Sequence, residues 1–195
     1  MPIYCFDGIP PPEKNEVLRK RYEHKEKIKK KIEDLKEEGN KEHADKLKNQ
    51  VVYVSKEHKK KLFELFELLG IPCIKAEGEA EELCAYLQKE NIANFTLTED
   101  TDSLVFGCSS ILKSSPDKNM YLEYNLRDIL FNLNLSYNQF IDMCILLGCD
   151  YCPSIYRLGP INGYKIIKEH RTIENSMESI TKNYTVPENF NYQKA

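Results

Sequence analysis

The chain has 195 residues, of which 41% are hydrophobic, and its formal net charge is −3 at pH 7. This length and composition predict one globular domain, or a domain with an appendage, with enough apolar side chains for a sizeable core. No apolar run reaches the roughly 18 residues of a membrane span, and the first residues lack a basic stretch followed by an apolar one. We therefore expect an intracellular protein without a membrane partner.

The charge is unevenly distributed along the sequence. Residues 13–61 contain 17 Lys or Arg and 11 Asp or Glu, a balance of +6, whereas the rest contains 11 and 20, a balance of −9. Basic patches attract phosphate backbones, and clustered carboxylates need counter-charge that divalent metal ions commonly supply. The pattern therefore predicts a protein that binds a polyanion together with metal ions.

The first elements are a short strand and a long, charged helical segment. Residues 3–6 form an apolar run that predicts a buried strand, and three prolines at 10–12 then block regular structure. From Glu13 to Lys48 the sequence is helix-forming, with Gly39-Asn40 as the expected end of one helix and start of another. Two interpretations are open: a projecting helical hairpin, or a solvated coiled coil or partly disordered arm.

Strands and helices alternate in the remainder of the chain. The expected elements are a helix from Ser55 to Gly70, a strand over 71–76, a helix over 79–90, a strand over 95–98, a hairpin of 111–113 with 120–124, a helix with Ser136 and Gln139 as a capping box, and helices over 164–170 and 172–180. This alternation is typical of βαβ units and predicts an α/β fold.

The seven cysteines are odd in number and mostly lie inside apolar runs, which favours reduced, buried thiols over a disulfide framework. Only Cys149 and Cys152 have CxxC spacing, and neither a second pair nor a histidine is close by in the sequence. Because a structural zinc site needs four such ligands, we interpret these two residues as core cysteines.

Six acidic residues follow predicted strands or apolar helices, or open a helix: Asp7, Glu79, Glu81, Asp100, Asp102 and Asp150. The carboxyl ends of strands meet at one edge of an open α/β sheet, so Asp7, Asp100 and Asp102 are expected to converge. Ligand sets made of oxygen alone suit Mg²⁺ or Mn²⁺, and two such ions about 4 Å apart promote phosphodiester hydrolysis.

Each acidic residue also has a simpler interpretation. Acids at helix N-termini interact favourably with the helix dipole, which by itself accounts for Glu79 and Glu81. The segment Asp100-Thr101-Asp102 could suggest a calcium loop, but the glycine and terminal glutamate of an EF-hand are absent at the required offsets. Only the whole ordered set favours a metal site.

Five ordered blocks of this sequence resemble those of the flap endonuclease (XPG-type) family of structure-specific 5′ nucleases. The blocks are Phe6-Asp7-Gly8, Gly78-Glu79-Ala80-Glu81, Thr98-Glu99-Asp100-Thr101-Asp102, Leu147-Gly148-Cys149-Asp150-Tyr151 and Val186-Pro187-Glu188-Asn189. The resemblance covers essentially the whole chain. It implies a twisted, mainly parallel sheet with helices on both faces, and a metal-dependent endonuclease and 5′–3′ exonuclease that cuts branched or 5′-flap DNA in replication and repair.

The resemblance also assigns roles to individual residues. Asp7, Glu79 and Glu81 resemble the ligands of a first Mg²⁺ ion, and Asp100, Asp102 and Asp150 those of a second, with Mn²⁺ as a substitute. Lys14 and Arg21 match two catalytic basic residues that the family directs at the scissile phosphate; seven residues are two helical turns, so they share a face.

Three regions of a partial nuclease domain over residues 1–181 follow from the resemblance, together with an extended tail over 182–195. They are a helical arch over 13–50, through which a 5′ flap passes, an acidic metal-site region over 77–150, and a helix-turn-helix region over 151–181. The last is expected to bind duplex DNA through Gly159, Gly163 and Lys165, with K⁺ as a possible further ion.

The sequence departs from the family pattern in and near the helix-turn-helix. Arg157 stands where the family usually has glycine, so a positive φ at this position would cost about 1 kcal/mol or more. Ile161 and Asn162 replace two basic residues, which predicts a weaker grip on duplex DNA.

Relative to the family, the chain is expected to lack about the first 80 residues and the C-terminal end. The earlier segment would carry a central strand and a further metal-binding aspartate, and the later one the tail that binds a sliding clamp. The chain is therefore either a fragment or a shortened relative, and we expect weak activity as it stands. A nuclear enzyme is the leading hypothesis; the alternatives are a non-catalytic nucleic-acid-binding remnant and a metal-dependent nuclease that acts on RNA.

Overall fold

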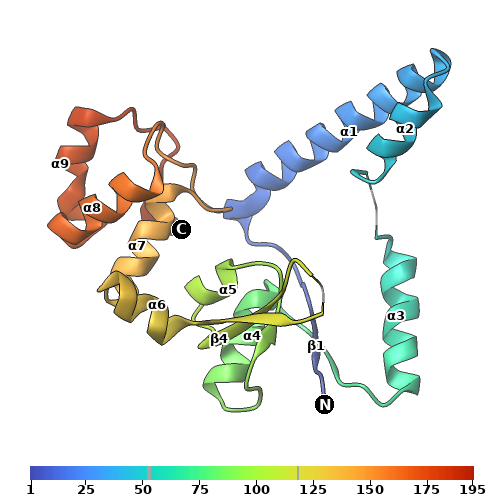
Figure 1. Cartoon of the computed structure of the whole chain (residues 1–195), viewed down its shortest axis with the longest axis horizontal. Helices are drawn as coiled ribbons and strands as arrows, with labels where there is room; N and C mark the ends of the chain where they lie inside the picture. Colours follow the sequence, from blue (N-terminus) through green and yellow to red (C-terminus); the bar gives the residue numbers. More distant parts are fainter. Residues whose placement is uncertain (52–53, 118) are drawn as a thin grey trace. The chain divides into compact units, whose positions relative to one another are not determined.

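The computed structural model describes residues 1–51, 54–117 and 119–195, and the chain divides into two compact units. Unit 1 comprises Met1–Tyr4 and Lys14–Ile74, and unit 2 comprises Cys5–Glu13 and Lys75–Ala195. Figure 1 shows the elements with the labels used below. Among the described residues, none of the helices combines the length and apolar composition needed to cross a membrane.

A pair of packed helices makes up much of unit 1. Helix α1 spans Asn15–Glu37 and α2 spans Lys41–Lys48 (Figure 1). Gly39, with φ of 78°, ends the first helix, and the Asn40 side chain caps the second by accepting a hydrogen bond from the His43 amide at 3.3 Å. Each helix buries one residue, Ile32 in α1 and Ala44 in α2. The helix–turn–helix order predicted for this segment is therefore present.

Helix α3 of unit 1 spans Lys56–Leu68 and begins with a capping box between Ser55 and His58. The leucine and phenylalanine residues of 62–69 give this helix an apolar face, and much of that face is exposed. Phe66 is its buried residue and stacks on the ring of Tyr4 with centroids 4.2 Å apart, whereas Leu68 is 86% exposed. Leu62 and Leu65 of α3 are 37% and 48% exposed, and Leu69, which follows the helix, is 61% exposed.

Two small sheets replace the single, mainly parallel sheet that the sequence predicts. Strand β1 (Tyr4–Phe6) pairs with β2 (Cys73–Lys75). In the second sheet, β3 (Thr96–Leu97) pairs in parallel with β4 (Ser110–Ser114), which pairs antiparallel with β5 (Tyr121–Asn125). The βαβ alternation does not specify which strands pair: β3 has only two residues and forms its ladder with β4.

The helices of unit 2 surround two apolar clusters. The helices are α4 (Ala80–Lys89), α5 (Asp102–Val105), α6 (Leu126–Leu133), α7 (Tyr137–Leu147), α8 (Pro160–His170) and α9 (Ile173–Asn183). Short 3-10 turns lie at Pro12–Lys14 and at Tyr192–Lys194, and the boundary between the two units falls within the first of them. The first cluster contains Ala85, Leu104, Cys108, Ile111 and Phe140. Helix α8 starts four residues earlier than the sequence predicts, because Pro160 occupies its first turn.

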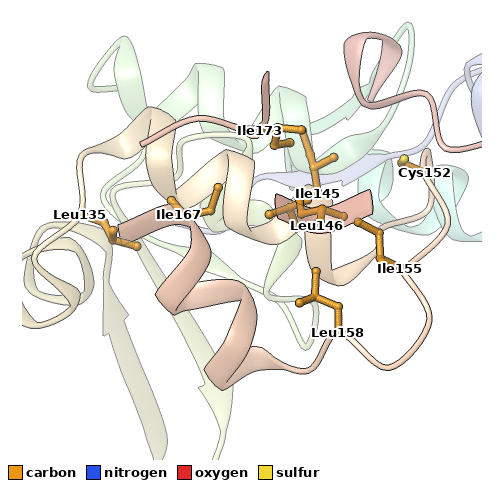
Figure 2. Close-up of a cluster of buried hydrophobic side chains, with 9 residues drawn as sticks. Leu135, Ile145, Leu146, Cys152, Ile155, Leu158, Ile167 and Ile173 are labelled. Carbon is orange, nitrogen blue, oxygen red and sulfur yellow. The ribbon is translucent and has the colours of Figure 1, made fainter. Parts of the chain in front are cut away.

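The second cluster joins α7, α8 and α9 with the segment between α7 and α8. Figure 2 shows its side chains, which include Leu146, Ile155 and Ile167. Residues of the final segment also pack against it, namely Tyr184, Val186, Phe190 and Tyr192. All seven cysteines are free, as predicted, although only Cys108 and Cys152 are fully buried.

Candidate functional site

All six acidic residues singled out by the sequence lie in unit 2. Asp7 follows β1, and its Oδ1 atom accepts a hydrogen bond from the Ala80 amide at 3.1 Å, at the first turn of α4. The backbone next to Asp7 also contacts the segment before α4, because the Gly8 amide donates a hydrogen bond to the Gly78 carbonyl at 2.7 Å. A Cβ at Gly8 would lie 2.1 Å from the Ala76 carbonyl oxygen, so only glycine allows this approach.

Glu81 is partly buried in the first turn of α4, and its surroundings raise its pKa. Burial is the largest cause, and the negative charges of Asp7, Glu79 and Asp100 add to it. Four of the predicted ligands are therefore close enough to affect one another. Bound cations relieve repulsion between carboxylates, so a divalent ion here would offset the effect of these negative charges on Glu81.

The loop after β3 is ordered by its own polar side chains. The Asp100 amide donates to Thr98 Oγ1 at 3.0 Å, and the Asp102 amide donates to Asp100 Oδ1 at the same distance. Asp102 then begins α5. The loop thus places Asp100 beside Glu81 and directs the chain so that Asp102 reaches a second location.

That second location is a hollow of about 370 Å³ that Asp102 shares with Asp150. Asp150 lies in the turn between Cys149 and Cys152, whose backbones form mutual hydrogen bonds of 2.9 and 3.3 Å. Gly148 precedes the turn with φ of 97°, and a Cβ there would lie 2.6 Å from the Cβ of Ser154. This glycine lets the chain leave α7 sharply and carry Asp150 into the hollow.

Two observations locate these carboxylates: the charges of Asp7, Glu79 and Asp100 act on Glu81, and Asp102 and Asp150 line one hollow. In the described ranges, no three His, Cys, Asp or Glu residues are grouped closely enough to hold a metal ion. The donors nevertheless fit Mg²⁺ or Mn²⁺ chemically, because all six are carboxylates, which hard divalent ions prefer over nitrogen or sulfur ligands. Cys144 and Cys149 are poor competitors, since burial raises the pKa of both thiols.

The basic residues predicted to act in catalysis belong to the other unit. Lys14 is the N-cap residue of α1, and Arg21 lies two turns further along the same helix. Their common face agrees with their seven-residue spacing, and their relation to the six acids stays a prediction.

The start of α8 carries the residues predicted to bind duplex DNA. Gly159 is the N-cap, and Lys165 is exposed on the helix. Gly163 is buried, and a Cβ there would lie 3.0 Å from Leu147 Cδ2, so glycine lets α8 pack closely on α7. Arg157 has a positive φ of 63°, a conformation that glycine adopts without strain and that arginine adopts only at a cost.

Sequence reasoning missed one residue on the helix that carries Glu81, namely Gln88. It is 7% exposed and its side-chain amide connects α4 with β3 and β4. The available signal was a glutamine at the end of an apolar helix face, two turns after Glu81. Such a position is usually apolar, so a polar residue there indicates buried hydrogen bonds.

Comparisons with known proteins agree with this geometry. Residues 70–150 match the family model described as the XPG I-region. The whole chain aligns with the flap endonuclease 1 of Aedes aegypti at 44% identity over 199 residues and with that of Entamoeba dispar at 40% over 198 residues, covering 52% and 53% of those proteins. The chain therefore spans about half the length of the curated relatives that it matches.

Solved structures give the same result. The catalytic core of Rad2 in complex with a DNA substrate matches 93% of this chain with a TM-score of 0.71 and 29% identity, over 51% of its own length. Flap endonuclease-1 from Methanococcus jannaschii matches the whole chain with a TM-score of 0.62 and 27% identity, over 65% of its length. The chain thus shares the fold of Rad2 and of flap endonuclease-1, and its whole length is similar to about half of the flap endonuclease 1 relatives.

Proposed function

We propose that the chain provides the acidic core of a metal-dependent, structure-specific 5′ nuclease that hydrolyses phosphodiester bonds in branched or 5′-flap DNA. The observation that carries this proposal is the hydrogen bond from the Ala80 amide to Asp7, which joins Asp7 to the first turn of α4, where Glu81 is partly buried. The shared hollow of Asp102 and Asp150 supports a second ion. The whole-chain similarity to flap endonucleases supports the proposed reaction and substrate class.

The roles of the residues follow from their chemistry. Asp7, Glu79 and Glu81 would hold one Mg²⁺ ion, and Asp100, Asp102 and Asp150 the other. Bound Mg²⁺ would supply activation of the attacking water and stabilisation of the leaving oxygen. The chain's own contribution is positioning: the Asp7–Ala80 hydrogen bond fixes the start of α4, and the loop hydrogen bonds fix Asp100 relative to Asp102.

Two further parts of the chain would hold the DNA. Helices α1 and α2 would form the arch, with Lys14 and Arg21 directed at the scissile phosphate. Helices α8 and α9 would form the helix-turn-helix, where amides at the start of α8, Gly159 and Lys165 contact the duplex backbone and K⁺ provides additional charge. In the cell such a protein would act in the nucleus, in replication and repair, with a sliding clamp as a partner of the whole protein.

Calorimetry with Mn²⁺ tests the metal site on the 195-residue chain without requiring catalysis. We expect saturable binding that Asp100→Ala weakens at least tenfold. Glu82→Ala is the matched control, because Glu82 is an exposed acid next to Glu81 that no part of the proposal uses. Absence of saturable binding, or equal effects of the two variants, would remove the proposed site.

Cleavage assays on matched substrates test the reaction. With Mg²⁺ present, we expect a 5′-flap DNA to be cut faster than an unbranched duplex or the corresponding RNA, and Asp150→Ala to abolish the difference. Preferential cleavage of RNA would instead assign the chain to a different class of metal-dependent nuclease.

One observation favours a second candidate, a non-catalytic nucleic-acid-binding remnant of the family. Within the described ranges, the acids do not form a group ready to hold an ion. This candidate predicts that the chain binds flap DNA through its basic helices, that Mn²⁺ does not change the affinity, and that no product accumulates.

A further inference from the structure

The side-chain amide of Gln88 uses all of its hydrogen-bonding capacity in the interior of unit 2. Its Nε2 atom donates to Thr96 Oγ1 at 2.7 Å and to the Ser110 carbonyl at 2.8 Å. Its Oε1 atom accepts from the Ser109 amide at 2.8 Å, from the Ser109 hydroxyl at 2.7 Å and from the Ser110 amide at 3.2 Å. One side chain of α4 thereby binds both strands of the parallel pair.

The position of this amide in the sheet explains these contacts. The register of β3 with β4 begins at the pair Thr96 and Ile111, so Ser110 lies one residue before the ladder. On its other side Ser110 pairs with Asn125 of β5. The Gln88 amide takes the place that a further residue of β3 would occupy, and satisfies the Ser110 amide and carbonyl.

The amide fits in only one orientation. If its oxygen and nitrogen were exchanged, two N–H donors would face the backbone amides of Ser109 and Ser110. Gln88, Thr96 and Ser110 are 7%, 8% and 4% exposed, so water does not replace a lost partner easily. Helix α4 is therefore held against β3 and β4 in a single position.

The position of α4 against β3 and β4 matters because both α4 and β3 lead to predicted metal ligands. Glu81 lies seven residues before Gln88 on the same face of α4, about 10 Å along the helix axis. Thr96 lies four residues before Asp100, and β3 runs directly into the loop that carries Asp100. A shift of α4 along the sheet would change the spacing between Glu81 and Asp100.

We propose that Gln88 is a positioning residue, whose amide fixes the spacing between the acids at the start of α4 and those after β3. This inference rests on the proposed function for its effect on metal binding, but the fixed position of α4 can be tested without metal. It assigns a role in the site to a residue that contacts none of the six acids.

The test compares Gln88→Met with Ile180→Val, both in the 195-residue chain. Methionine keeps the length of the side chain and removes every hydrogen bond, while Ile180 is fully buried in the other apolar cluster. Gln88→Leu is a second variant in case the first does not fold. We expect the Mn²⁺ dissociation constant to increase at least fivefold for Gln88→Met and less than twofold for Ile180→Val, measured well below both melting temperatures.

Amide hydrogen exchange without metal provides the independent readout. We expect exchange of the α4 amides to accelerate at least tenfold in Gln88→Met and to stay unchanged in Ile180→Val. Wild-type Mn²⁺ affinity in Gln88→Met would overturn the inference. If the wild-type chain binds no Mn²⁺, the proposed function fails, and hydrogen exchange then tests the position of α4 by itself. Unchanged protection of the α4 amides in Gln88→Met would overturn the fixed position of α4. Faster exchange in Gln88→Met, but not in Ile180→Val, would support it.

Discussion

Arg157 is held in a left-handed backbone conformation, with φ of 63°, where a side chain costs about 1 kcal/mol or more relative to glycine. The guanidinium group lies 5.2 Å from the centre of the Tyr156 ring, which offsets part of that cost. A substitution by alanine removes the ring contact and keeps the strain, whereas glycine removes both. The two substitutions therefore separate the backbone effect from the side-chain effect.

We expect Arg157→Gly to be more stable than Arg157→Ala by about 1 kcal/mol, with the wild-type chain between them or close to the alanine variant. Equilibrium unfolding in urea measures the difference. Equal stabilities of the two variants would show that the strain is relieved elsewhere in the segment between α7 and α8.

Asp142 shows how burial affects a carboxyl outside the candidate site. It lies on α7, and its Oδ2 atom accepts a hydrogen bond from the Ile173 amide at 3.2 Å. Burial raises its pKa above the usual 3.8; the Ile173 hydrogen bond opposes this, and the charge of Glu174 adds to the increase. The folded chain thus binds this proton more readily than the unfolded chain does, so the contribution of Asp142 to stability decreases as pH rises through its folded pKa.

Asp142→Asn removes this titration and keeps the hydrogen-bond acceptor. We expect the stability of Asp142→Asn relative to wild type to increase as pH rises from about 3 to 6, and to be constant at higher pH. Thermal melts across this range measure the difference. Glu178→Gln, an exposed change on α9, is the control, and a pH-independent difference for Asp142→Asn would contradict the assignment.

At this scale the sequence locates residues whose role follows from local pattern. The acids after strands and the capping residue Ser136 are local features, whereas the glycine expected at Arg157 follows only from the resemblance to the family. Gln88 and Asp142 escape such reasoning, because their partners lie on other elements and no spacing rule connects them.

At the scale of elements, the turn after α7 determines where Asp150 lies. Gly148 has φ of 97° and ψ of 138°, a combination that only glycine adopts readily, and its missing Cβ leaves room for Ser154. Gly39, between α1 and α2, also has a positive φ, but no atom lies within 4 Å of the position of its Cβ. The two glycines therefore differ in steric crowding.

We expect Gly39→Ala to cost about 1 kcal/mol of stability, the amount of left-handed strain alone, and Gly148→Ala to cost at least 2 kcal/mol more. Gly148→Ala should also weaken Mn²⁺ binding, because Asp150 moves, while Gly39→Ala should not. Urea unfolding and calorimetry measure the two effects. Similar results for both glycines would show that Ser154 moves away at little cost.

Helix boundaries and the β4–β5 hairpin were predictable at this scale, and the pairing of β3 was not. Capping residues and glycines mark the ends of α2, α3, α7 and α9 within a few residues. The parallel partner of a strand depends on contacts distant in sequence, so the pairing of the short β3 with β4 could not be predicted from the alternation of elements. The exposed leucines of α3 have the same origin, because an apolar helix face does not specify what covers it.

For the whole molecule, the segregation of charge predicts where DNA binds. Lys27, Lys30 and Lys31 are exposed on α1, in the basic part of the chain. We expect replacement of all three by glutamine to weaken DNA binding and to reduce the slope of log K against log salt by up to about 2.7, because each phosphate contact contributes about 0.9. Fluorescence anisotropy at several salt concentrations measures this slope.

The matched control changes the charge of unit 2 by the same amount. Replacing Lys89, Lys113 and Lys182 by glutamine should leave the slope unchanged, since the proposed DNA contacts use none of these residues. If both triple variants reduce the slope equally, DNA is attracted by net charge and does not bind to α1 in particular.

The Asp7–Ala80 hydrogen bond joins residues 73 positions apart and so has a consequence for the order of folding. The contacts within α1 and α2 are local and form quickly, whereas closing a long loop requires a larger loss of chain entropy before any contact compensates for it. Asp7 therefore joins Glu79 and Glu81 late. During synthesis on the ribosome, the helices of residues 15–48 can form before the Asp7–Ala80 hydrogen bond, because the acids of α4 that are proposed as metal ligands have not yet emerged.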